Sequence, residues 1–159
     1  MSVGGKRAEA TMQRTYEFEL WRGERQWIIA AFDLPEAITQ GEDVQDACES
    51  AADVLREVSR DAMMRGATLP SPSFGNEPRN GGICVIVSVE VNLSEMEKVS
   101  ATEAARLLGV SRSRVTAMIA SRHLDGWREG RNTWVTRASV EARLADAPAP
   151  GRPRKEALA

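Results

Sequence analysis

A long amphipathic segment, residues 43–66, constrains the fold more than any other feature, because its apolar side has to be covered. Apolar residues recur there every three or four positions, which is the spacing of one helix face. They are Val44, Ala47, Cys48, Ala51, Val54, Leu55, Val58 and Ala62. Asp43 is a suitable N-cap and Gly66 a natural stop. The sequence therefore predicts one helix that packs its apolar stripe onto a sheet.

Strand patterns on both sides of this helix supply the sheet. Residues 16–21 alternate apolar and acidic side chains, which predicts a half-buried strand with one acidic face. Residues 26–32 predict a more buried partner strand, and residues 37–40 a third, short one. Residues 83–91 are rich in β-branched side chains and predict a fourth strand. The expected fold class is α+β, with the order β-β-β-α-β for a domain at residues 15–92.

Charge divides the chain into two parts. Residues 1–99 hold 10 Lys and Arg against 17 Asp and Glu, a net −7, whereas residues 100–159 hold 11 against 6, a net +5, which together give the overall −2. The basic part suits a polyanion, and the acidic part either repels nucleic acid or meets a basic protein. Two modules with different partners are expected.

The chain has the character of a cytoplasmic protein. Its N-terminus is polar and lacks the apolar stretch of a signal peptide, and no apolar run approaches the ~18 residues of a membrane-spanning helix. Cys48 and Cys84 lie far apart among apolar neighbours, which predicts reduced core residues and not a disulfide or a metal pair. Residues 1–14 are expected to be disordered.

No catalytic constellation is visible. His123 is the only histidine, and the chain has no His/Cys ligand cluster, phosphate-binding glycine loop or nucleophile motif. Acids such as Asp46, Glu49 and Asp53 are spaced along one helix face without a partner that would tune them for acid–base work. We therefore expect no enzyme activity, no cofactor and no metal.

The N-terminal part contains a set of short motifs around the predicted helix: Asp33-Leu34-Pro35, Thr39-Gln40-Gly41-Glu42-Asp43, Asp46-Ala47 and residues 66–73. In these residues it resembles the HicB family of antitoxins. The chain departs from the family at Glu36-Ala37, where Gly-Cys is common. The resemblance implies an incomplete RNase H-like domain without nuclease activity, which binds and blocks a small basic toxin of the HicA type.

The net charge of the acidic part fits that role, because an acidic face can cover the RNA-binding surface of such a toxin. The alternative is that these carboxylates are simply a solvated surface. No individual toxin-contacting residue can be assigned from the sequence.

The basic part opens with two short helices. Ser100 and Glu103 have the spacing of a capping box, Gly109 permits a sharp turn, and Ser111 caps a second helix. In that second helix, the apolar residues Val115, Met118 and Ile119 point inward. This pattern is typical of a helix-turn-helix.

The other side of the second helix is polar and basic. The first turn of a recognition helix enters the major groove, where arginine bonds guanine and hydroxyl groups contact bases or phosphates. The alternative is an ordinary solvated helix face. The predicted DNA-binding residues here are Arg112, Ser113, Arg114, Thr116, Ala117 and Arg122.

Residues 127–135 predict a hairpin, or wing. Arg128, Arg131 and Asn132 lie at or near its tip, where they can meet the phosphate backbone or the minor groove. Trp127 and Trp134 suggest packing of the wing, with base stacking as the alternative. Thr136 then caps a last helix, whose Val140 and Leu144 are expected to face inward.

Residues 99–144 resemble the excisionase and MerR-like winged DNA-binding domains, and we place this domain at 99–145. Those relatives bind DNA as dimers or cooperatively, and none is an enzyme in this part. Residues 146–159 predict a disordered basic tail. In that tail, Arg152 and Arg154 flank a proline as in an AT-hook, and a generic basic tail that adds phosphate contacts is the alternative.

The expected function is that of an antitoxin-like transcriptional repressor, which neutralises a HicA-type RNase toxin and binds operator DNA as a homodimer or higher oligomer. Dimerisation through strand edges of the N-terminal sheet would place two DNA-binding domains on one operator site. The alternative is an orphan or mobile-element regulator of the excisionase type, which has no toxin partner.

Overall fold

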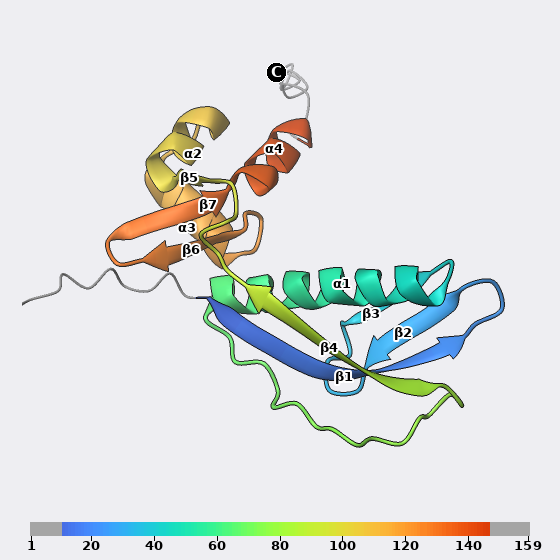
Figure 1. Ribbon diagram of the computed structural model, residues 1–159. Coiled ribbons are helices and arrows are strands. Elements are labelled where there is room, and N and C mark those ends of the chain that lie inside the picture. The colour runs from blue at the N-terminus through green and yellow to red at the C-terminus, as the bar shows by residue number, and fades with distance from the viewer. Residues whose placement is uncertain (1–10, 147–159) are drawn as a thin grey trace, which may run out of the picture. The chain divides into compact units, whose positions relative to one another are not determined.

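A computed structural model describes residues 11–146 of the chain, in two compact units that divide between Met96 and Glu97 (Figure 1). The described residues form four helices and two antiparallel sheets, so the class is α+β as the sequence predicts. The hook residues Arg152 and Arg154 lie outside the described residues. Within residues 11–146, no helix combines the length and the apolarity that crossing a membrane requires.

The first unit is a four-stranded sheet with one long helix. Its strands lie in the order β3-β2-β1-β4, and all neighbours are antiparallel. The first strand begins inside the segment 1–14 for which the sequence suggests disorder. The elements are β1 (Met12–Arg22), β2 (Trp27–Ala31), β3 (Ile38–Gly41), α1 (Val44–Arg65) and β4 (Ile83–Val91).

Helix α1 begins and ends where the sequence predicts. The Asp43 carboxylate accepts the backbone N–H of Asp46 at 2.7 Å, and Gly66 ends the helix with a left-handed φ of 63°. The buried face differs at two positions from the predicted stripe. Val44 is exposed, whereas Ser59 is buried and donates its hydroxyl to the Leu55 carbonyl at 2.6 Å.

The core of this unit lies between α1 and one face of the sheet. Phe18, Leu20 and Ile29 come from the two central strands, and Leu55 comes from the helix; all are at most 1% exposed. Alanines 47 and 51 let the helix approach the sheet closely. Strand β1 is nevertheless buried on both faces, because its acidic side is covered as well.

Glu17 and Glu19 carry that second face, and they are buried at 4% and 3% exposure. The Glu17 carboxylate accepts the backbone N–H groups of Gly75 and Asn76, at 3.0 and 2.7 Å. The expectation of a half-buried strand with an outward acidic face is therefore wrong here. These two carboxylates hold the long connection, residues 66–82, across the sheet.

Glu19 accepts the backbone N–H groups of Asn80, Arg79 and Gly82, at 2.6, 3.0 and 3.2 Å. Burial raises the pKa of Glu19, but the Asn80 and Arg79 N–H groups outweigh it and hold the pKa below its ordinary value. The Gly75 N–H, followed by that of Asn76, likewise holds the pKa of Glu17 low against burial. Both side chains act as ionised acceptors.

The two cysteines do not share one environment. Cys48 on α1 is half-buried, whereas Cys84 on β4 is exposed, which corrects the expectation that both are core residues. Cys84 pairs with Glu19 in the sheet register, so strand alternation puts it on the face that α1 does not cover. Its Sγ lies 3.1 Å from the Asn76 carbonyl oxygen of the long connection.

The second unit is a small three-stranded sheet, in the order β5-β7-β6, with three helices. Strand β5 begins at Lys98, two residues before the Ser100 cap, where the sequence pattern predicts no strand. The helices and the sheet enclose a core that contains Val99, Val115, Leu124, Val135 and Val140. The elements are β5 (Lys98–Ser100), α2 (Ala101–Leu108), α3 (Arg112–Ala120), β6 (Gly126–Glu129), β7 (Asn132–Thr136) and α4 (Arg137–Ala145).

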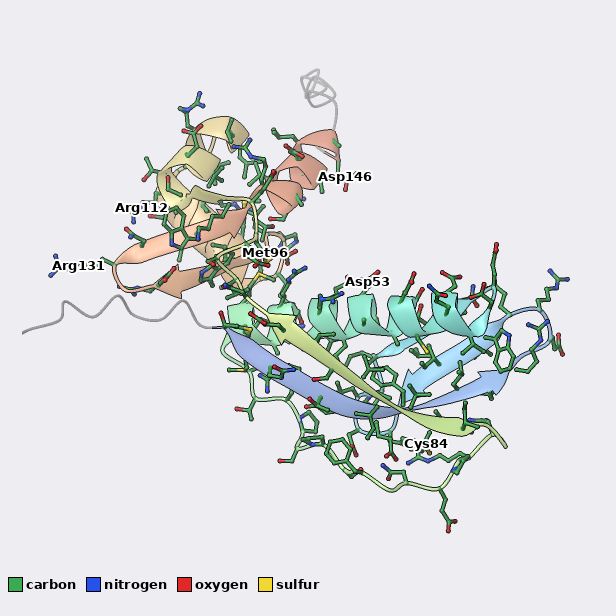
Figure 2. The ribbon with its side chains drawn as sticks, in the orientation of Figure 1. Asp53, Cys84, Met96, Arg112, Arg131 and Asp146 are labelled. Carbon is green, nitrogen blue, oxygen red and sulfur yellow. The ribbon has the colours of Figure 1, made fainter. Side chains whose placement is uncertain are left out.

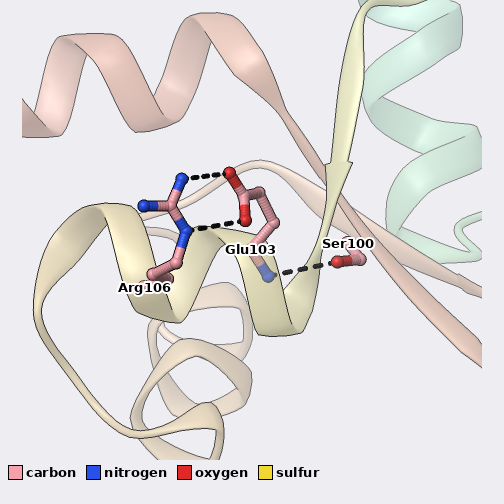
Figure 3. Close-up of polar contacts among 3 residues, drawn as sticks. All are labelled: Ser100, Glu103 and Arg106. Atoms are coloured by element: carbon pink, nitrogen blue, oxygen red, sulfur yellow. Dashed lines mark hydrogen bonds and ion pairs between the residues drawn. The ribbon is translucent and has the colours of Figure 1, made fainter.

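Only half of the predicted capping box forms at the start of α2 (Figure 3). The Ser100 hydroxyl accepts the backbone N–H of Glu103 at 3.1 Å, but the Glu103 carboxylate turns to Arg106, at 2.6 and 2.9 Å. At the other end of the unit, Val140 of α4 is buried as expected. Leu144 is 46% exposed, so its predicted inward position is wrong.

We predict that Glu19→Gln lowers the free energy of unfolding at about pH 7, since an amide nitrogen donates where the connection needs an acceptor. The folded-state pKa of Glu19 is lowered, so its stabilisation is lost as pH falls through that value. The difference from the native chain should therefore shrink at about pH 3 in urea titrations. The exposed Glu90→Gln on β4 serves as the control. An equal difference at both pH values, or an equal effect of Glu90→Gln, would contradict this role.

Candidate nucleic-acid interface

Helix α3 has one buried side, which fixes what its other side presents. Val115 and Met118 are buried against the core of the second unit, and Ile119 is half-buried. The Ser111 hydroxyl caps the helix by accepting the Arg114 N–H at 3.1 Å. Because the apolar side faces inward, the side that begins at Arg112 faces outward.

The outward side carries the five residues of α3 that the sequence suggests for DNA binding. All of them are exposed: Arg112, Ser113, Arg114, Thr116 and Ala117. Figure 2 shows Arg112 projecting from the helix. The Thr116 hydroxyl donates to the Arg112 carbonyl at 3.3 Å. No ion pair between described residues involves Arg112 or Arg114, so both guanidinium groups stand open to a ligand.

A three-residue turn joins α2 to α3. Gly109 ends α2 with a φ of 65°, a left-handed conformation that glycine adopts without steric cost. The Val110 N–H then donates to the Ala105 carbonyl at 3.0 Å. This turn sets the two helices against each other and leaves the first turn of α3 free of covering chain.

Arg122 lies just beyond α3 in an unfavourable backbone conformation. Its φ is 63°, and no other described residue except glycine has a positive φ. Its N–H donates to the Ile119 carbonyl at 3.1 Å, and the His123 N–H donates to the Met118 carbonyl at 2.8 Å. This is a Schellman motif, whose left-handed position normally holds glycine. An arginine there costs about 1–2 kcal/mol of backbone strain.

The predicted hairpin is formed by β6 and β7. Glu129 pairs with Asn132, so Gly130 and Arg131 make a two-residue turn, with Gly130 at a φ of 60°. Arg131 projects from the tip (Figure 2), and Asn132 is also exposed. The Arg128 Nε donates to the Gly130 carbonyl at 3.2 Å, which holds that guanidinium beside the turn.

The two tryptophans of the hairpin serve packing. Trp127 and Trp134 pair across the strands. Trp127 is only 7% exposed, so its ring offers no open face to a base, and Trp134 is half-buried. The Lys98 ammonium lies 5.7 and 5.0 Å from their ring centroids, a double cation–π contact. This position of Lys98 could not be predicted from the sequence, because no residue near Lys98 along the chain indicates that its ammonium meets these two rings.

A shallow hollow beside the end of α3 contains a further arginine, which no sequence motif indicates. Arg143 of α4 lines it together with Arg122, His123, Asp125 and Asp146. His123 is exposed, and its Nδ1 lies 2.7 Å from the Ser121 hydroxyl. The two carboxylates make this hollow a mixed surface, so the open cations concentrate on α3 and the hairpin tip.

The first unit offers acids, many of which have local partners. On α1, Asp53 pairs with Arg56 and Asp61 with Arg65, while Asp46 accepts the Glu42 N–H at 2.9 Å. No cluster of three or more His, Cys, Asp or Glu side chains suited to a metal ion occurs within residues 11–146. The exposed Glu49 carboxylate accepts the Gln45 Nε2 at 3.1 Å, whereas no hydrogen bond or ion pair between described residues involves the exposed Glu57 carboxylate. Both carboxylates face solvent, where a basic protein can meet them.

The residues that carry the HicB resemblance meet in space. The Asp33 carboxylate accepts both the N–H and the hydroxyl of Ser73, at 2.6 and 2.8 Å. The Tyr16 hydroxyl donates to the Pro70 carbonyl at 2.5 Å. Asp33 and residues 70–73 of the motif therefore fasten the long connection to the sheet, whereas Asp43 of the motif caps α1.

Comparison with known proteins gives similar structures but no matching family model and no matching curated protein. A chain of a toxin–antitoxin complex from Streptococcus pneumoniae is 18% identical, with a TM-score of 0.45 over 70% of this chain and 99% of that one. The antitoxin HicB of Burkholderia pseudomallei, a crystal structure, is 19% identical, with a TM-score of 0.44 over 83% and 96%. At TM-scores below 0.5, neither likeness carries an argument about this chain.

We predict that Arg122→Gly raises the free energy of unfolding of the chain by about 1 kcal/mol, because glycine removes the left-handed strain. Ala117→Gly is the control, because Ala117 is exposed in the interior of α3; it should lower that free energy by about 0.5–1 kcal/mol, since glycine weakens a helix interior. Urea denaturation followed by tryptophan fluorescence measures both. Destabilisation by Arg122→Gly would show that the arginine side chain itself stabilises the fold.

Proposed function

We propose that residues 97–146 form a winged helix-turn-helix that binds double-stranded DNA, and that the whole chain is a transcriptional repressor of the antitoxin type. The observation that carries the DNA proposal is the outward side of α3. Arg112 and Arg114 stand there with two hydroxyl side chains, and no carboxylate lies between Ser111 and Leu124.

The proposed docking places the first turn of α3 in the major groove. Arg112 and Arg114 reach guanine edges there, because a guanidinium can bond O6 and N7 of guanine at once. Ser113 and Thr116 bond bases or phosphates. The positive end of the α3 dipole points at the same groove and adds attraction for the phosphates.

The hairpin tip supplies the contacts that hold the domain in position on the DNA. Arg131 and Asn132 are exposed at the turn, at a place where a wing meets the phosphate backbone or the minor groove. Arg128 is oriented toward that turn by the Gly130 carbonyl. These contacts strengthen binding to DNA of any sequence, whereas the base contacts of α3 distinguish one DNA sequence from another.

Arg122 fits the same interface. A strained backbone conformation persists where function or surrounding structure requires it. Glycine at this position would form the same turn without strain. The presence of arginine despite the strain therefore indicates that its side chain has a role. We assign it a phosphate contact at the end of α3.

The antitoxin part of the proposal concerns residues 11–96. It is supported by the order β1-β2-β3-α1-β4, by the HicB-like motif, and by the net −7 of residues 1–99. Since the motif residues fasten the long connection, the toxin contacts lie elsewhere, among exposed carboxylates such as Glu49 and Glu57. An acidic surface of this kind covers the basic RNA-binding surface of a HicA-type toxin.

We predict that Arg112→Ala and Arg114→Ala each weaken binding to the chain's own promoter by about 10- to 100-fold, which is ~1–3 kcal/mol for a lost base contact. Fluorescence anisotropy with the promoter fragment and with an unrelated duplex measures the loss and the preference between them. Arg25→Ala, in the β1–β2 turn of the first unit, is the control and should bind normally. Unchanged binding by both α3 variants would show that this helix does not dock as proposed.

We predict that the tagged full-length chain, purified from its native host, carries a stoichiometric small basic protein that high salt releases. Mass spectrometry identifies the protein. Arg112→Ala is the matched variant, because it binds DNA poorly and must capture the same protein if DNA does not bridge the two. A clean preparation that still binds its promoter would leave a regulator without a toxin.

A further inference from the structure

The outer edge of β4 is the longer of the two free edges of the first sheet. The strand order leaves β3 and β4 outermost, with four and nine residues respectively. Strand β4 pairs with β1 along its whole length, from Ile83 opposite Leu20 to Val91 opposite Met12. Beyond that ladder, no backbone hydrogen bond among residues 11–146 involves β4.

This edge lacks the devices that keep strands from pairing with other chains. Natural edges are shortened, bulged, or marked by lysine and proline. Residues 83–91 contain no Lys, Arg, Pro or Gly, and Glu90 is their only charged residue. Ile83 and Ile86 are 59% and 62% exposed, the two most exposed large apolar side chains among the described residues.

We propose that β4 of one copy pairs antiparallel with β4 of a second copy about a two-fold axis. The two four-stranded sheets then become one continuous sheet of eight strands. Such a contact is self-complementary, as a two-fold interface requires. This pairing requires neither DNA nor a toxin.

The low charge of the β4 edge favours a second copy of the chain over a basic protein as its partner. Apart from Glu90, the exposed side chains of β4 are apolar, thiol or hydroxyl groups, so a basic protein would find a single carboxylate there. Self-pairing also brings no like charges together. With Ile86 of one copy opposite Ile86 of the other, each Glu90 faces Gly82, and the two Glu90 residues stand ~27 Å apart at about 3.4 Å per residue.

That register gives the interface its apolar centre. The two Ile86 side chains cover each other, which removes the most exposed apolar surface on the strand. Cys84 of one copy then lies opposite Ser88 of the other, on the sheet face away from α1. Residues directly opposite each other in antiparallel strands have Cα atoms about 4.5–5.5 Å apart.

The first experiment is light scattering after size exclusion on the full-length chain and two variants. Ile86→Lys puts a charge at the centre of the proposed interface and should halve the particle mass. Ile38→Lys is the matched control, since Ile38 is 54% exposed on the opposite edge strand, and it should leave the mass unchanged. Circular dichroism checks that both variants are folded.

The second experiment reports the register without a charged substitution. Ser88→Cys, treated with oxidised glutathione, should form a covalent dimer through Cys84, because the Cα separation suits a disulfide. The double variant Cys84→Ser/Ser88→Cys should form none. A monomeric native chain, a dimer that persists in Ile86→Lys, or the absence of the cross-link overturns the proposal.

Discussion

In both units, an apolar stripe that has to be buried decides which side chains face outward. Helix α1 covers Phe18 and Leu20 with an alanine-rich face, and α3 buries Val115 and Met118. Burying one large apolar side chain is worth about 1.5–3 kcal/mol, far more than any single exposed polar contact gives. The rotation of α3 about its axis is therefore fixed, and Arg112 and Arg114 are presented to solvent as a consequence.

The first unit adds a polar constraint to this apolar one. The covered acidic face of β1 would be destabilising if Glu17 and Glu19 lacked partners. The N–H groups of residues 75–82 supply those partners, and they are groups that a connection without helix or strand would otherwise leave to water. The same hydrogen bonds therefore give the buried carboxylates of β1 their partners and order the connection.

Structural features that depend on residues close together in the sequence could be predicted from it. The caps at Asp43 and Ser111, the stops at Gly66 and Gly109 and the β6–β7 hairpin all follow from residues within a few positions of one another. The exposed side of α3 follows from helical periodicity in the same way. The DNA contacts assigned to it stay a prediction, as does the role of residues 152 and 154 outside the described chain.

The predictions from sequence are wrong where residues far apart in the sequence determine the burial or pairing of a side chain or strand. Glu17 and Glu19 suggest a solvated face until residues 75–82, some sixty positions away, are seen to cover them. Strand β5 exists because β7 lies beside it, and a three-residue strand has no periodicity of its own. Cys84 and Leu144 are exposed although each stands in an apolar sequence pattern, because such a pattern does not say how much of a side chain the rest of the fold covers.

The central claim, that α3 and the β6–β7 tip are the DNA-binding surface, is tested most directly by nuclear magnetic resonance. The ¹⁵N-labelled chain is titrated with its promoter duplex, and amide shifts are followed residue by residue. We expect the largest changes at residues 111–123 and 128–132, with residues 11–96 unchanged. Shifts concentrated on the first unit, or spread evenly over the chain, would contradict the claim.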